Sequence, residues 1–190
     1  MKKAFTLIEI LVVISIIGLL GGIFWANYQG GERHSQLYSA RDTFLQNLRL
    51  AQTNALVGTE LDGTIPAGGW GLHIEASSSS YYIVFADTNA NEVYDEGEAV
   101  SSIDLPDGVE FYKIGGTLAG TSLTEAELVN SVDSYLLSLP LDMVFDYDTK
   151  NLIIQDTGSI LVNVAIVLRE VNEMATTAVF ANTAGLLTTY

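Results

Sequence analysis

The sequence predicts an α+β fold in which a long N-terminal helix packs on a mostly antiparallel β-sheet head. Three observations predict this fold: an apolar run over residues 5–26, a stripe of apolar residues at helical spacing after it, and short β-type segments separated by turn residues from residue 58 onward. With 190 residues, the chain is long enough to bury one sizeable core. The sequence contains no internal repeat and no linker long enough to separate two folded domains.

The apolar run, FTLIEILVVISIIGLLGGIFWA, extends from Phe5 to Ala26. As an α-helix it would be about 33 Å long, which is enough to cross the hydrocarbon core of a bilayer. Lys2 and Lys3 precede it, and paired lysines keep this end of a membrane helix on the cytoplasmic side. We therefore expect a single-pass membrane protein whose head lies outside the cytoplasm.

The small residue Ala4 stands before the apolar run. A conventional signal peptide has the opposite order, because its shorter apolar segment is followed by a small-residue cleavage site. Cleavage after Ala4 would remove both lysines and leave the apolar helix on the mature protein. We accordingly expect residues 1–4 to be a leader peptide, residues 5–31 a transmembrane and assembly helix, and residues 32–190 an amphipathic helix with a globular β-rich head.

Glu9 places a carboxylate within the apolar run. Such a group costs about 2.5–3.5 kcal/mol at the centre of a membrane helix and less near its end, so one interpretation is an acid tolerated at the membrane interface. The other interpretation is a charge that needs a partner. Cleavage between Ala4 and Phe5 would expose an α-amine four residues before Glu9, and in a packed array of helices a neighbour's amine would neutralise the carboxylate.

The segment from Ala4 to Glu9, AFTLIE, with the lysines before it and the apolar run after it, resembles the processing site of type IV prepilins and type II secretion pseudopilins. The resemblance implies that a prepilin peptidase cuts before Phe5 and methylates the new amine, and that Glu9 serves in subunit docking. It also implies an inner-membrane assembly platform and other pilin or pseudopilin subunits as partners. The family more often has glycine at the position of Ala4, and many major pilins have proline where this chain has Ala26.

After the apolar run, the polar and glycine-containing segment Asn27–Gly31 is expected to interrupt the helix. Beyond it, apolar residues recur at spacings of three and four, which predicts an amphipathic helix that ends near Gly58. The residues of this stripe are Leu37, Ala40, Phe44, Leu48, Ala51 and Ala55.

Three arginines, Arg33, Arg41 and Arg49, lie eight residues apart along the same predicted helix. This spacing places them on broadly one side of it. One interpretation is an ordinary solvated face, and the other is that these arginines meet the acidic heads of neighbouring subunits.

Periodicity and turn residues predict a series of strands in the head. The expected strands are Trp70–Glu75, Tyr81–Ala86, Val109–Ile114, Met143–Tyr147, Leu152–Gln155, Ser159–Arg169, Thr176–Asn182 and Leu186–Tyr190, with turns at Ser77–Ser80 and Asp148–Asn151. Between these strands, Ser122-Leu123-Thr124-Glu125 has the form of a capping box and predicts a short helix that ends before Pro140.

The head also resembles the minor pseudopilins of the GspH/FimT type, more loosely than the N-terminus resembles prepilins. The segments that carry this resemblance are Arg41–Val57, Tyr82–Glu98 and Asn182–Leu187, while Gly115–Leu139 has no counterpart. Some members of that branch bind DNA through a basic C-terminal tail, but this chain ends GLLTTY. Since the formal net charge is -15, and such a charge repels nucleic acid, we expect no nucleic-acid partner.

Catalytic motifs are not found in the sequence. It has no cysteine, no G-x-S-x-G, no P-loop and no H-E-x-x-H, and its two histidines, His34 and His73, fall on different predicted elements. We therefore expect a protein that is not an enzyme.

One acidic segment, Asp87–Glu98, has the donor order of a calcium loop of the EF-hand kind. The expected ligands at positions 1, 3, 5, 7, 9 and 12 are Asp87, Asn89, Asn91, the Val93 carbonyl, Asp95 and Glu98. Two features depart from that pattern: Glu92 occupies the sixth position, where an EF-hand has glycine, and a strand leads into the loop. The segment is therefore either a Ca²⁺ site or an ordinary acidic turn, which Asn and Asp also favour.

These observations favour a structural subunit of a type IV pilus-like filament or of a type II secretion pseudopilus. The alternative is a minor subunit at the filament tip that acts as an adhesin or binding module. Its contact surface would be the acidic loop or Gly115–Leu139. The copy number in purified filaments distinguishes the two roles.

Overall fold

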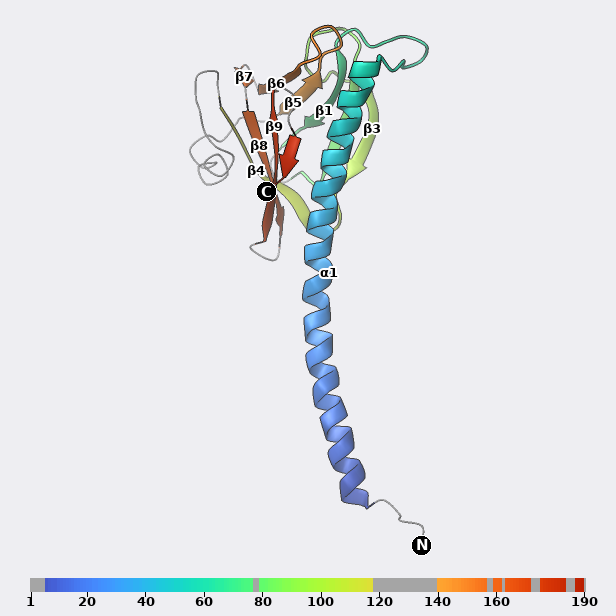
Figure 1. Cartoon of the computed structure of the whole chain (residues 1–190), viewed down its shortest axis with the longest axis vertical. Coiled ribbons are helices and arrows are strands. Elements are labelled where there is room, and N and C mark those ends of the chain that lie inside the picture. The colour runs from blue at the N-terminus through green and yellow to red at the C-terminus, as the bar shows by residue number, and fades with distance from the viewer. Residues whose placement is uncertain are drawn as a thin grey trace. The chain divides into compact units, whose positions relative to one another are not determined.

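The structure, a computed structural model, describes residues 6–76, 79–117, 140–156, 159–161, 163–171, 175–183 and 187–189. The chain forms two compact units, Met1–Ser35 and Gln36–Tyr190, and its fold is α+β as predicted (Figure 1). The elements of the described residues are α1 (Leu7–Val57), β1 (Gly69–Ile74), β2 (Tyr81–Asp87), β3 (Ala99–Asp104), β4 (Val109–Thr117), β5 (Leu141–Phe145), β6 (Leu152–Asp156), β7 (Ser159–Leu161), β8 (Asn163–Glu170), β9 (Thr176–Asn182) and β10 (Leu187–Thr189).

The expected interruption of the helix at Asn27–Gly31 is wrong, because α1 is helical from Leu7 to Val57. A glycine inside a helix costs only about 1 kcal/mol relative to alanine. The cost of Gly30 and Gly31 is therefore small enough for the helix to continue through them.

The predicted apolar stripe of the second half of α1 is confirmed: each of its residues, from Leu37 to Ala55, is at most 2% exposed. The stripe belongs to one hydrophobic core together with the inner faces of both sheets. At its centre, the Phe44 ring contacts Tyr82 of β2 and Phe111 of β4 edge-to-face, at centroid distances of 5.0 and 5.6 Å. One aromatic side chain of α1 thus ties the helix to both sheets.

Tyr82 fills this core without leaving its hydroxyl unpaired, because Asn47 Nδ2 donates to the phenol oxygen at 2.6 Å. Burial raises the pKa of the Tyr82 phenol above its ordinary value, and the hydrogen bond from Asn47 partly opposes that rise. The phenol therefore stays neutral at physiological pH.

The strands form two sheets, a division that the sequence pattern does not specify. One sheet has the order β3-β2-β1-β5-β6-β7 and the other the order β10-β9-β8-β4. All the strand pairings in the described residues are antiparallel. The core lies between the inner faces of the sheets and the apolar stripe of α1.

Several strand predictions differ from the structure in detail. The segment predicted as one strand over Ser159–Arg169 forms β7 and β8, which belong to different sheets. The prediction missed β3, an edge strand whose residues are mostly exposed and give no alternating pattern. Strand β5 ends two residues before the predicted boundary at Tyr147. The predicted helix before Pro140 lies outside the described residues, as does part of the Ser77–Ser80 turn.

The C-terminus of α1 ends as predicted at Gly58, which has a φ of +71°. The Thr59 N–H donates to the Asn54 carbonyl at 2.9 Å, which closes the last turn. The Lys150 Nζ donates to the Ala55 carbonyl at 3.4 Å and brings a positive charge to the negative end of the helix dipole. A side chain at Gly58 would meet the Tyr147 ring at 2.9 Å, so this contact also requires glycine.

We expect Phe44→Ala to destabilise the head by about 3–5 kcal/mol, because it leaves a cavity between the helix and both sheets. In the full-length chain in detergent, the melting temperature of the head should fall by about 10 °C. Thr43→Ala is the matched control, since its side chain is exposed on the same turn and its effect should be within the error of the measurement. Equal effects of the two substitutions would contradict the central role of Phe44.

Candidate functional site

The N-terminal unit presents an apolar helix whose side chains are exposed. Leu7–Trp25 is 19 residues long and is the segment of the described chain that is long and apolar enough to cross a membrane. No residue of this segment is buried within the molecule. Its length of about 29 Å matches the hydrocarbon thickness of a bilayer. The segment therefore meets the requirements of a membrane anchor.

Glu9 lies in the first turn of α1 and closes a capping box with Thr6. The Glu9 N–H donates to Thr6 Oγ1 at 3.3 Å, and Glu9 Oε2 accepts from the Thr6 hydroxyl at 3.3 Å and from the Thr6 N–H at 3.4 Å. A carboxylate in the first turn is also stabilised by the positive end of the helix dipole. The sequence carried this signal as T-x-x-E, but sequence reasoning missed it.

The capping box bears on both interpretations of Glu9. Its hydrogen bonds lower the cost of a carboxylate at the start of an apolar helix, in agreement with a tolerated acid. They also hold the carboxylate at the helix N-terminus, next to the position at which cleavage would create an amine. Ala4 and Phe5, the predicted processing residues, lie outside the described residues.

In the head, the acidic segment forms a closed loop whose ends are held together. The Ala86 N–H donates to the Glu98 carbonyl at 3.1 Å. Glu98 Oε1 accepts from the N–H and the hydroxyl of Thr88, both at 2.8 Å, and Oε2 accepts from the Asp95 N–H at 3.1 Å. Glu98, predicted as the last calcium ligand, thus closes the loop through hydrogen bonds.

Asp87, predicted as the first ligand, is fully buried at the end of β2. Its Oδ1 accepts from the Ala90 N–H at 2.7 Å and from the Asn91 N–H at 3.4 Å, and its Oδ2 accepts from the Glu92 N–H at 2.8 Å. Gly68 makes room for this carboxylate, because a Cβ there would lie 2.0 Å from Asp87 Oδ2. Asp87 therefore organises the turn that follows it.

The middle of the loop makes a sharp turn, although it lacks the glycine expected at the sixth position. Glu92, at the sixth position, has a φ of +65°, a conformation that usually favours glycine. Asn89 Oδ1 accepts from the Asn91 N–H at 3.0 Å, and Asn91 Oδ1 accepts from the Val93 N–H at 3.1 Å. The departure at the sixth position thus does not prevent the sharp turn.

The predicted ligand side chains are close in the loop but do not converge on one point. Asp95 Oδ2 accepts from the side-chain amides of Asn89 and Asn91, at 2.7 and 2.8 Å. Within the described ranges, no group of three or more Asp, Glu or His side chains is placed to hold a metal ion. Binding of Ca²⁺ would therefore require Asp95 to exchange these amides for the ion.

The loop is fastened to the six-stranded sheet by its aromatic residue. The Tyr94 ring lies 4.6 Å from the His73 ring and 5.4 Å from the Phe85 ring. His73 Nδ1 is 2.7 Å from Asp142 Oδ1 on the neighbouring strand, and both side chains are buried. The His73–Asp142 pair depends on the register of β1 and β5, so it could not be predicted from a sequence pattern.

A hydrogen bond also joins the loop to β6, where Gln155 Nε2 donates to Glu92 Oε2 at 2.7 Å. The side chain of Glu92 is thereby turned toward the sheet, while Asp95 and Glu96 are exposed. The exposed parts of the loop are thus residues 88–91 and 95–97, on either side of the half-buried residues 92–94.

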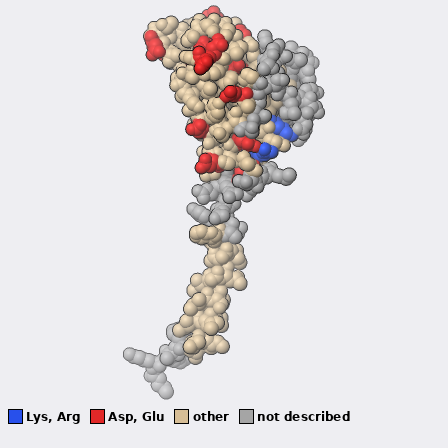
Figure 2. Space-filling model, turned by 180° about the vertical axis from the view of Figure 1, so that it is seen from behind, with Lys and Arg blue, Asp and Glu red and all other residues tan. Residues whose placement is uncertain are grey.

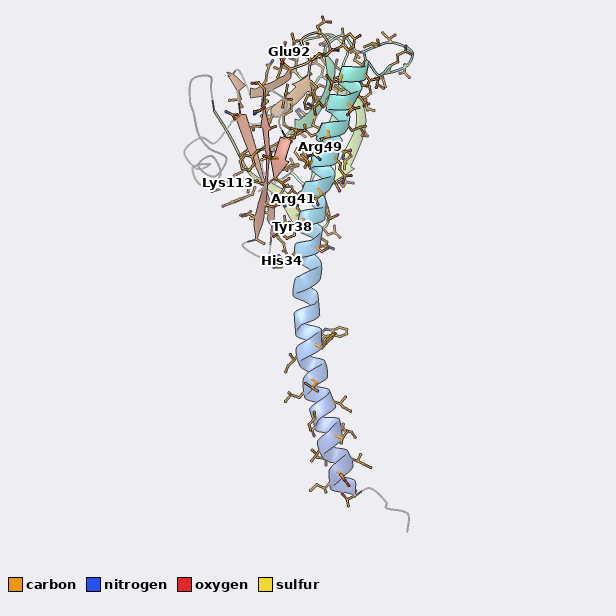
Figure 3. All side chains as sticks on the ribbon, in the orientation of Figure 1. His34, Tyr38, Arg41, Arg49, Glu92 and Lys113 are labelled. Atoms are coloured by element: carbon orange, nitrogen blue, oxygen red, sulfur yellow. The ribbon has the colours of Figure 1, made fainter. Side chains whose placement is uncertain are left out.

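The predicted row of arginines divides into different environments. The side chain of Arg33 lies outside the described residues. Arg41 is paired with Asp42 at 2.7 Å and lies 5.1 Å from the centroid of the Tyr38 ring. Arg49 is exposed, and Figure 3 shows both arginines on the head portion of α1. The hypothesis of contact with neighbouring acidic heads therefore applies most directly to Arg49.

Comparison with known proteins finds a family match for the N-terminus and none for the head. Residues 1–25 match the family described as "Prokaryotic N-terminal methylation motif". No curated protein and no solved structure matches the chain. The chain therefore carries a type IV pilin-like prepilin signal at its N-terminus, in agreement with the resemblance of AFTLIE.

Proposed function

We propose that the chain is a structural, non-enzymatic subunit of a type IV pilus-like or pseudopilus filament, assembled through its N-terminal helix. The observation that carries this proposal is the methylation motif at residues 1–25 on a helix that is exposed and apolar through Trp25. A membrane holds this helix before assembly, and in the filament the helices of neighbouring subunits replace the lipid. The head remains outside the cytoplasm.

The proposed assembly route begins with a prepilin peptidase that cuts between Ala4 and Phe5. The inner-membrane assembly platform then transfers the subunit into the filament. Assignment to the GspH/FimT branch rests only on the looser resemblance of the head segments. A minor tip subunit would be processed in the same way and would differ in its copy number.

Docking through Glu9 follows from the cost of its charge. When a subunit enters the filament, a neighbour's Phe5 amine offers the carboxylate an opposite charge in an apolar environment, where an ion pair is stronger than in water. The Thr6 capping box keeps the carboxylate at the N-terminal end of its own helix, the end at which each processed subunit carries its Phe5 amine. The capping box and the docking interaction are therefore compatible.

The acidic loop supports a second, smaller proposal, that Asp87–Glu98 binds Ca²⁺. The positive φ of Glu92 and the closed ends of the loop favour it. The donors would be the side chains of the predicted ligands with the Val93 carbonyl, a set of hard oxygens that suits Ca²⁺. The ion would fix the exposed residues of the loop, among them Asn89, Asn91 and Asp95.

For processing, we predict that the mature chain begins at Phe5 and that its amine is methylated. The small side chain of Ala4 and the pattern that follows it fit the peptidase. Mass spectrometry of the N-terminal peptide from the membrane or filament fraction measures this directly. A mature chain that begins at Met1, or at a residue beyond Ala26, would contradict the proposal.

For assembly, we predict that Glu9→Ala remains membrane-inserted but is incorporated poorly into filaments, because insertion of an uncharged helix is easier and only the docking partner is lost. Loss of the capping box costs about 0.5–2 kcal/mol, so Thr6→Ala is the matched control: it removes the cap and retains the carboxylate. Immunoblots of sheared filaments and membranes measure incorporation. If Thr6→Ala is as defective as Glu9→Ala, the cap and not the docking charge explains the loss.

For the loop, we predict that Ca²⁺ raises the melting temperature of the full-length chain in detergent relative to a chelator. Calcium at about 100 times its Kd would stabilise the head by roughly 2.7 kcal/mol. Asp95→Ala should abolish this shift. Glu96→Ala, which removes the same charge beside the donor set, should retain it at constant ionic strength. An equal shift with Mg²⁺, or one that survives Asp95→Ala, would identify the loop as an ordinary acidic turn.

A further inference from the structure

The exposed side of α1 in the head has an uncharged face. Its residues are Ser39, Thr43, Gln46, Leu50, Thr53 and Val57, which we call the outer helix face. They recur at alternating spacings of four and three, so they line up along the helix. All of them are exposed, on the side opposite the apolar stripe that packs into the core.

This composition is unusual for a surface of this chain. The formal net charge is -15, with 23 acidic residues against eight basic ones, and Figure 2 shows Asp and Glu spread over one face of the head while Lys and Arg gather at one place. On the outer helix face, Leu50 and Val57 are instead 54% and 76% exposed. Two copies of so acidic a chain repel each other over most of their surfaces, and an uncharged face removes that repulsion locally.

Arg49, next to Leu50, borders the outer helix face, and its positive charge is not paired with any residue that the structure describes. In the unit Gln36–Tyr190, the other basic side chains all have partners. Arg41 pairs with Asp42, Arg169 pairs with Glu110, Lys150 donates to the Ala55 carbonyl, and Lys113 lies over the Tyr112 ring. Among the residues that the structure describes, the Arg49 guanidinium makes no ion pair, hydrogen bond or ring contact.

We propose that the outer helix face docks against the acidic head of a second copy of this chain, and that Arg49 receives a carboxylate from that copy. The charge balance selects this occupant, since a chain with few cations and many exposed carboxylates offers the acid that Arg49 lacks. The uncharged face supplies the apolar contact beside the ion pair, in the arrangement of a desolvated centre with a charged rim. This inference rests on the proposed filament role and identifies the head surface that neighbouring subunits share.

A zero-length cross-link tests the contact directly. Arg49→Lys keeps the positive charge and adds an amine that a carbodiimide couples to a carboxylate in contact with it. Filaments are assembled from a mixture of isotope-labelled and unlabelled copies of the full-length variant. They are then treated with the carbodiimide and digested with a protease, and the peptides are analysed by mass spectrometry. We expect peptides that join position 49 of one copy to an Asp or Glu of the other isotope. We expect none when detergent dissociates the filaments before the carbodiimide is added.

The outcomes separate this inference from the proposed function. Cross-links only within one copy, or to a different protein, would overturn the inference while the filament role stands. A wild-type chain that never enters filaments would overturn both.

Charge reversal gives an independent measurement. Arg49→Glu should lower incorporation into filaments by about tenfold or more, because it sets a carboxylate against the acidic head of the neighbour, whereas Arg49→Lys should assemble as the wild type does. The melting temperature should be unchanged in both variants, since the guanidinium makes no contact in the described part of the head. Normal assembly of Arg49→Glu would overturn the proposal.

Discussion

The structure depends on one constraint: a single helix, α1, has to serve two different surroundings. Up to Trp25 its side chains are apolar on all sides, apart from Glu9 and Ser15, and none is buried within the molecule. From Leu37 onward, the buried residues of α1 are those of the apolar stripe and Leu45 beside it. The first half therefore needs a partner outside the chain, lipid or a neighbouring helix, whereas the second half finds its partner in the head.

Two charged residues of α1, Glu9 and Arg49, reflect the same constraint. In the apolar half, Glu9 has the Thr6 cap and the helix dipole to reduce the cost of its charge. In the head half, Arg49 stands at the border of an uncharged face on a strongly acidic chain. Each charge is incompletely used by the isolated subunit, and each would gain an opposite charge from a second copy. In the proposed filament, a second copy would thus supply interactions that the fold of one subunit does not make.

The sequence predicted those elements that are determined locally. The period of the apolar stripe and the stop at Gly58 were correct, because periodicity and backbone conformation depend on neighbouring residues. The division of the strands into two sheets and the exposed edge strand β3 depend on distant pairing, and neither was predicted. The same distinction holds in the loop. The order of oxygen-bearing side chains from Asp87 to Glu98 is evident in the sequence, but the contact of Tyr94 with His73 depends on the register of the sheet.

The central claim is that the N-terminus of one subunit meets Glu9 of another inside a filament. A photo-reactive amino acid at Ile10, beside Glu9, tests this claim most directly in assembled filaments of the full-length, processed chain. The account predicts cross-linked peptides that contain the Phe5 end of a second copy, and it predicts that none form when the filaments are dissociated before illumination. Cross-links to lipid alone, in filaments that contain the chain, would contradict it.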